Sequence, residues 1–197
     1  VRKELQFNVT WLPNDGSQHE GPGYGSCAGA LGVALQVSDE LTGTRFLESP
    51  FFAGVAPYAV HISTPGMKES FYFSDCFDKA VSFHPYFLRT AATHRQADVL
   101  DGIRHALRVN SGKWGIKDYA WLAILADDPD IQGGDFRRLP TAHFLPDLGI
   151  TLVRDSWADD AVGARFKCGP LGGYRSNAWL ASRDAAGWSA HAARADV

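Results

Sequence analysis

The hydrophobic pattern of this 197-residue chain changes its period near residue 140, after the segment FRRLPTA. Upstream of that segment, apolar residues recur about every 3.6 positions, as they do along amphipathic helices. Downstream, in 150–154 and again in 161–168, the pattern repeats every two residues, so that successive side chains belong to opposite faces, which is typical of half-buried strands. Helices followed by strands predict an α+β fold and do not suggest alternating βαβ units.

Four helices are expected before the change of period. The ranges 24–41, 50–62 and 96–109 have one apolar face each, and Gly43 stands where the first of them should end. The range 114–126, WGIKDYAWLAILA, is apolar nearly all round and therefore predicts a buried helix.

The strands at 150–154 and 161–168 should pair antiparallel through the turn-rich DSWADD, and a further strand is expected at 177–182. The chain opens within the helix-like VRKELQF and closes on HAARADV without a turn or cap, which is typical of a fragment of a longer protein. Residues 1–140 are assigned to a helical domain and residues 141–197 to the start of a sheet domain.

Composition excludes several classes of partner. With 45% hydrophobic residues the chain can bury a core, and 19 basic against 22 acidic residues produce a net charge of −3, which creates no field toward nucleic acid or an anionic membrane. No apolar run is long enough to span a bilayer. Cys27, Cys76 and Cys168 form no CxxC pair, so we interpret them as buried thiols instead of a disulfide or metal site.

Residues 15–24, DGSQHEGPGY, place three glycines directly before a tyrosine. Each glycine loses much conformational freedom on folding, so such a stretch needs a compensating role. Two interpretations stay open: the glycines bring the backbone and the phenol of Tyr24 against a ligand, or the loop caps a helix and Tyr24 only packs.

Four separated segments resemble the heparinase II/III-like superfamily. They are DGSQHEGPGYGS, SFYFSDCFD at 70–78, HFLPDLGITLVRDSW at 143–157 and AVGARFKCGPLGGYRSN at 161–177. The resemblance implies a partial (α/α) toroid followed by the first strands of an antiparallel β-sandwich. It also implies a lyase of uronic-acid polysaccharides such as heparin, heparan or alginate, or a uronyl C5 epimerase.

The resemblance implies a role for Tyr24 as the catalytic acid/base of a β-elimination, because the reaction removes the proton beside a uronate carboxylate and protonates the leaving oxygen. An unperturbed phenol titrates near ~10, so positive surroundings such as a helix N-terminus are required. Glu20 belongs to the motif and either orients the tyrosine and binds sugar, or simply favours a helix N-terminus. His19 matches no family position and is expected at the surface.

In the family, HxHxD on a later strand carries the histidine that neutralises the carboxylate. The corresponding segment here is WSAHAARAD, 188–196, in which His191 stands one residue out of register and Arg194 replaces the usual metal ligand. His191 is therefore either the carboxylate neutraliser, through a bulge, or a polar strand residue. Arginine has no lone pair to offer, which argues against a divalent metal such as zinc, and no cofactor is required.

The loop GPLGGYRSN, 169–177, is either a turn or a substrate contact through Tyr174, Arg175 and Asn177. Trp157, Trp179 and Trp188 are expected in the core instead of on a sugar platform, and Asp75 as a structural acceptor.

The predicted function is cleavage of an acidic polysaccharide by a periplasmic or secreted lyase. A uronyl C5 epimerase and a non-catalytic carbohydrate-binding fragment remain as alternatives. The predicted partners, beyond the polysaccharide, are the rest of the same chain or an oligomer partner.

Overall fold

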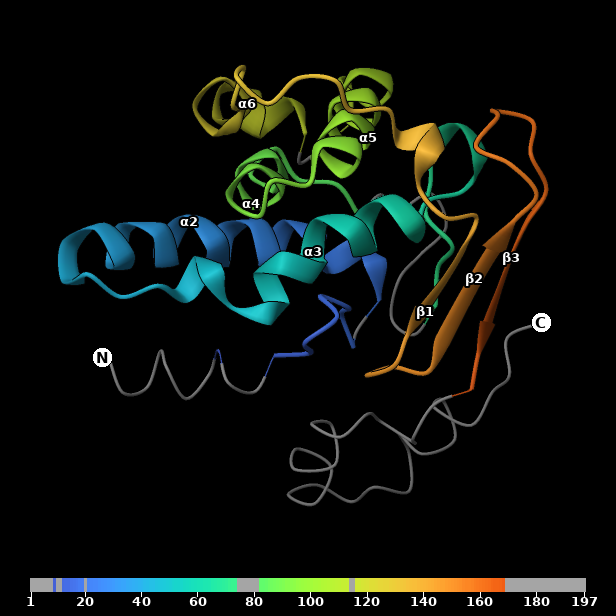
Figure 1. The fold of residues 1–197 in the computed structure, drawn as a ribbon, viewed down its shortest axis with the longest axis horizontal. Helices are drawn as coiled ribbons and strands as arrows, with labels where there is room; N and C mark the ends of the chain where they lie inside the picture. The colour runs from blue at the N-terminus through green and yellow to red at the C-terminus, as the bar shows by residue number, and fades with distance from the viewer. Residues whose placement is uncertain (1–8, 10–11, 20, 74–81, 114–115, 169–197) are drawn as a thin grey trace.

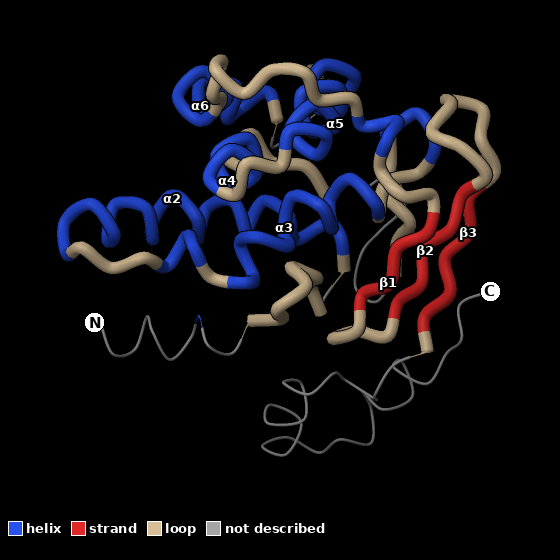
Figure 2. Tube along the Cα trace, viewed as in Figure 1, coloured by secondary structure: helices blue, strands red, loops and turns tan. Residues whose placement is uncertain are grey.

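The structure of the protein is a computed structural model that describes residues 9, 12–19, 21–73, 82–113 and 116–168 (Figure 1). Within them, five α-helices precede a three-stranded antiparallel sheet, which stands at one end of the helical layer (Figures 1 and 2). The α+β prediction, with helices followed by the first antiparallel strands, is confirmed.

The α-helices are α2 Gly25–Thr42, α3 Pro50–His61, α4 Phe87–Thr93, α5 Ala97–Val109 and α6 Ala120–Ala126. The short 3₁₀ turns are η1 Pro22–Tyr24, η2 Phe46–Glu48, η3 Pro65–Met67, η4 Lys117–Tyr119 and η5 Phe136–Arg138. The strands are β1 Ala142–Leu145, β2 Ile150–Arg154 and β3 Gly163–Lys167. The predicted ranges match α2, α3, α5, β2 and β3 closely, whereas α4 and β1 were not predicted. No helix of the described ranges is both long and apolar enough to cross a bilayer.

Helix α2 packs through glycines as well as through Ala28 and Leu35 of its predicted apolar face, which are 6% and 0% exposed. A Cβ at Gly25, Gly29 or Gly32 would lie within 2.4 Å of the segment 82–86. That close approach buries the glycine face and turns part of the predicted apolar face outward, so Leu41 is 80% exposed. The helix and its end at Gly43, which has the left-handed φ of 68°, were predicted correctly, and its buried face was predicted in part.

A proline inside α3 shapes how α3 meets the rest of the helical layer. Pro57 has no N–H to donate to the carbonyl of Ala53 four residues earlier. The Gln96 side chain, just before α5, donates to that carbonyl at 2.9 Å. A side chain therefore replaces the missing helical hydrogen bond and ties α3 to α5.

The described part of the apolar segment 114–126, residues 116–126, does not form the fully buried helix that the composition predicts. Only Ala120–Ala126 is α-helical, and Leu122 and Ala126 face inward. Trp121 and Ile124 are 56% and 83% exposed. The prediction was wrong because helical periodicity cannot say how many sides of a helix have neighbours.

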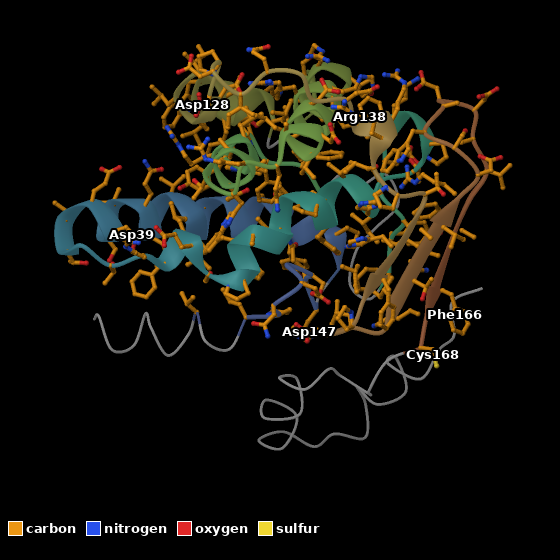
Figure 3. The ribbon with its side chains drawn as sticks, in the orientation of Figure 1. Asp39, Asp128, Arg138, Asp147, Phe166 and Cys168 are labelled. Carbon is orange, nitrogen blue, oxygen red and sulfur yellow. The ribbon has the colours of Figure 1, made fainter. Side chains whose placement is uncertain are left out.

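The sheet has the order β1-β2-β3, with both pairs antiparallel. Its inner face forms an apolar core with the end of α3, made of Tyr58, Ile62, Phe73, Leu145, Leu148, Ile150 and Leu152. On the outer face, Phe144 and Phe166 flank Thr151 in one row and are 60% and 54% exposed. Figure 3 shows Phe166 on the far edge of the sheet from the helices.

The cysteines differ from expectation. Cys27 and Cys168 are both free and exposed, so the prediction of buried thiols was wrong for these two, because Cys27 lies on the outer side of α2 and Cys168 just after β3. Cys76 and the predicted strand at 177–182 lie outside the described residues.

Candidate functional site

Tyr24 lies where the sequence predicts it, at the start of a helix. Gly21 adopts φ 101°, Pro22 opens the 3₁₀ turn η1, and Tyr24 is the last residue of that turn and the N-cap of α2. No side chain caps this end of α2 in the described chain, and its first turn carries no acidic residue. Tyr24, a partly buried residue, therefore stands at the positive end of an 18-residue helix.

The glycine at position 16 has a structural role. Gly16 has φ +74°, and a Cβ there would lie 2.1 Å from the carbonyl carbon of Gly54 in α3. From the other side, a Cβ at Gly54 would lie 2.4 Å from the carbonyl carbon of Asp15. Two backbones touch at this point. Part of the glycine content of the loop before Tyr24 thus serves packing against α3 and not approach to a ligand.

A reciprocal pair of hydrogen bonds fastens the same loop to the sheet. The Asp147 N–H, in the turn between β1 and β2, donates to Asp15 Oδ2 at 2.9 Å, and the Asn14 N–H donates to Asp147 Oδ2. Asp15 Oδ1 also accepts from the Ser17 N–H at 3.0 Å and from the Ser17 hydroxyl. Figure 3 shows Asp147 at the end of the sheet nearest this loop. The loop that leads to Tyr24 is thereby held by α3 on one side and by the sheet on the other.

Gln18, in this loop, is only 8% exposed, yet neither its side-chain oxygen nor its nitrogen has a hydrogen-bond partner in the described chain. Buried polar atoms are normally paired. This amide is therefore a candidate contact for a polar ligand, and no pattern in the sequence had singled it out.

Two histidines lie at the centre of the interface between the end of α3 and the sheet, which is called the seam below. His61, the last residue of α3, stacks on His143 of β1 with ring centroids 4.0 Å apart and an interplanar angle of 6°. The ring of Trp157 meets His61 edge-on at 5.4 Å. Trp157 is buried, as predicted, and its indole N–H donates to the Leu139 carbonyl at 2.8 Å.

A buried arginine completes this seam. Arg154 of β2 is 8% exposed and donates from Nη2 to the carbonyls of His61 and Ser63 at 2.7 and 2.9 Å. Its guanidinium carbon lies 3.9 Å from the centroid of the Trp157 ring. No carboxylate among the described residues forms an ion pair with it. Arg154 thus binds the carbonyl end of α3, where a cation is favoured.

Burial keeps these histidines neutral at ordinary pH. Burial, followed by the charges of His143 and Arg154, lowers the pKa of His61 from 6.5 to about 3. Burial also lowers the pKa of His143, while the nearby Asp15 carboxylate opposes that shift. The end of α3 would favour a charged His61, but the cost of burial is larger.

Six residues were predicted to form the catalytic and substrate-binding site. Five of them, Glu20, Tyr174, Arg175, Asn177 and His191, lie outside the described residues, as does Asp75. His19 is partly buried and so departs from the surface position expected for it. Of the predicted catalytic and substrate-binding residues, only Tyr24 has a described position.

The seam residues His61, His143 and Arg154 were not predicted as a group. The sequence contained one signal, because Arg154 lies on the same side of β2 as the buried residues Ile150 and Leu152. An arginine at a position that alternates with exposed residues and shares its side of the strand with apolar residues indicates a buried cation. In the described part of the chain, no three His, Cys, Asp or Glu side chains gather to form a metal site.

Neither a comparison of the chain with models of protein families nor one with curated proteins found a match.

Proposed function

We propose that this chain carries the acid/base tyrosine of a polysaccharide lyase that cleaves uronic-acid polymers by β-elimination. The observation that carries the proposal is the position of Tyr24 at the N-cap of α2, in a loop held on both sides. A helix N-terminus stabilises negative charge, so it favours both a phenolate and the anionic substrate that a uronate polymer presents.

In this reaction, a base removes the proton on the carbon next to the uronate carboxylate. The electrons form a double bond to the neighbouring carbon, whose bond to the glycosidic oxygen breaks, and an acid protonates the leaving oxygen. Tyr24 is proposed as that acid/base, with His191 as neutraliser of the carboxylate. Glu20, Tyr174, Arg175 and Asn177 are proposed as substrate contacts, in a periplasmic or secreted protein that needs no cofactor.

A fixed loop serves this chemistry, because proton transfer requires the phenol and the sugar to meet within hydrogen-bonding distance. The backbone contact at Gly16 and the Asp15–Asp147 hydrogen bonds limit the freedom of the segment that leads to Tyr24. The unpartnered amide of Gln18 adds a group that could bind a sugar hydroxyl.

The test is to incubate the protein with heparin, heparan sulfate, dermatan sulfate and alginate and to follow the ultraviolet absorbance of unsaturated uronate. The variant Tyr24→Phe removes only the hydroxyl and should lower turnover about 100-fold or more, within the range for loss of a general acid/base. The control Tyr72→Phe changes a tyrosine that is 52% exposed and should keep full turnover. Full turnover in Tyr24→Phe would refute the assigned role.

The same incubation in deuterated water separates the other functions. Incorporation of deuterium into the polymer without a rise in absorbance would identify a C5 epimerase, because that enzyme returns a proton to the same carbon. Binding without either signal would identify a carbohydrate-binding protein.

A further inference from the structure

The seam between α3 and the sheet encloses a titratable ring. His61 is 3% exposed and lies between the parallel ring of His143 and the edge of Trp157. Arg154 spans the same junction through the carbonyls of His61 and Ser63. Each of these contacts joins a residue at the end of α3 to a residue of the sheet or of the loop that follows β2. The seam is therefore a joint between the sheet and the helical layer, beside the apolar core that the sheet shares with the end of α3.

The titratable groups that face this joint are nearly all bases, of which Arg154 is charged and the histidines are neutral at ordinary pH. His143 faces His61 from β1, and Arg154 faces it from β2. The one acidic group that acts on the pair in the described chain is Asp15, which faces His143 from the loop before α2. A proton on His61 would thus add a buried positive charge beside a buried guanidinium without a carboxylate to compensate it.

We propose that the stacked pair His61–His143, together with Arg154, is an acid-sensitive latch that holds the sheet on α3 when both rings are neutral and releases it when His61 is protonated. Release would also move the β1–β2 turn, whose Asp147 fastens the loop that leads to Tyr24. The latch would therefore control whether Tyr24 and the sheet keep a fixed arrangement. It does not depend on the proposed chemistry and can be tested without any substrate.

The direction of the effect follows from proton linkage. In the closed state the pKa of His61 is about 3, whereas an exposed imidazole has 6.5, so the open state binds the proton more tightly. The closed state is fully favoured above pH 6.5 and loses this advantage as the pH falls toward 3. Between pH 7.5 and 5, these two values predict a roughly 30-fold rise in the opening equilibrium constant for one such group.

The experiment is amide hydrogen exchange of the full 197-residue chain at pH 7.5, 6 and 5, corrected for the intrinsic pH dependence of exchange. The latch predicts that amides of β1 and β2 lose about 30-fold in protection at pH 5 and are then less protected than amides of α5, because the sheet opens while the helical layer stays folded. Equal protection of the sheet and of α5 at all three pH values would show that the sheet opens only when the whole protein unfolds, and it would overturn the proposal. Unchanged protection of the sheet would overturn it as well.

The variant His61→Phe keeps an apolar ring for stacking but cannot take a proton, so the sheet should keep its protection at pH 5. If that variant does not fold, His143→Gln serves instead, because it removes one of the two groups that disfavour the proton on His61 and should reduce the acid response. The control His94→Phe removes a histidine that hydrogen-bonds to the Leu47 carbonyl within the helical layer, and it should keep the full response. A full response in both seam variants would refute the latch.

Discussion

Substituting Gly16 by alanine tests whether the loop before Tyr24 is positioned by direct backbone contact with α3. The φ of +74° alone costs an alanine about 1–2 kcal/mol. The added Cβ would also lie 2.1 Å from the carbonyl carbon of Gly54, and overpacking of this kind costs about 1–3 kcal/mol. The two effects together predict a loss of about 2–5 kcal/mol, a large fraction of the ~5–15 kcal/mol by which domains are stable.

The matched control is Gly43→Ala at the end of α2. Gly43 has nearly the same φ, +68°, but a Cβ there would have no atom within 4 Å. Its expected loss is therefore the conformational part alone, about 1–2 kcal/mol.

Urea unfolding of both variants, followed by circular dichroism, measures their free energies of unfolding. Gly16→Ala should be less stable than Gly43→Ala by about 1–3 kcal/mol. Gly54→Ala approaches the same contact from α3, so its loss should not add fully to that of Gly16→Ala in the double variant. Equal losses for Gly16→Ala and Gly43→Ala would show that the loop does not touch α3 as described.

Two further substitutions test contacts within the helical layer by urea unfolding. Gln96→Ala leaves the Ala53 carbonyl without its donor and should cost about 1–2 kcal/mol, whereas the exposed Gln132→Ala should change stability by less than about 0.5 kcal/mol; similar values for the two would contradict the role of Gln96 at the α3 proline. Arg104 donates to both carboxylate oxygens of Asp127 and to two carbonyls, a fork that lysine cannot reproduce, so Arg104→Lys should cost about 1–2 kcal/mol. The control is Arg45→Lys, since Arg45 pairs with Glu48 at the surface with its side chain 78% exposed, and the substitution should change stability very little. An equally small change for Arg104→Lys would contradict the hydrogen bonds assigned to Arg104.

The sequence by itself determined that helices precede strands and that Tyr24 lies at the start of a helix. The periods of 3.6 and 2 are local properties of the chain, so they predicted α3, α5, β2 and β3 within one or two residues. Likewise, the end of α2 at Gly43 and its start at Tyr24 follow from the backbone preferences of neighbouring glycine and proline. β1 was not assigned, because its four residues are too short for a clear alternation.

Only the tertiary structure decided which faces are buried and which groups meet. Leu41 and Ile124 lie on apolar faces but are exposed, because burial depends on the neighbours that the fold supplies. His61 and His143 are 82 residues apart and stack only because the sheet packs on the end of α3. The glycines before Tyr24 could be interpreted from the sequence as a ligand loop or as a packed loop. The contact of Gly16 with α3 shows that one of them serves packing. The sequence does not show this, because the backbone that occupies the place of a side chain at Gly16 comes from a segment distant in the chain.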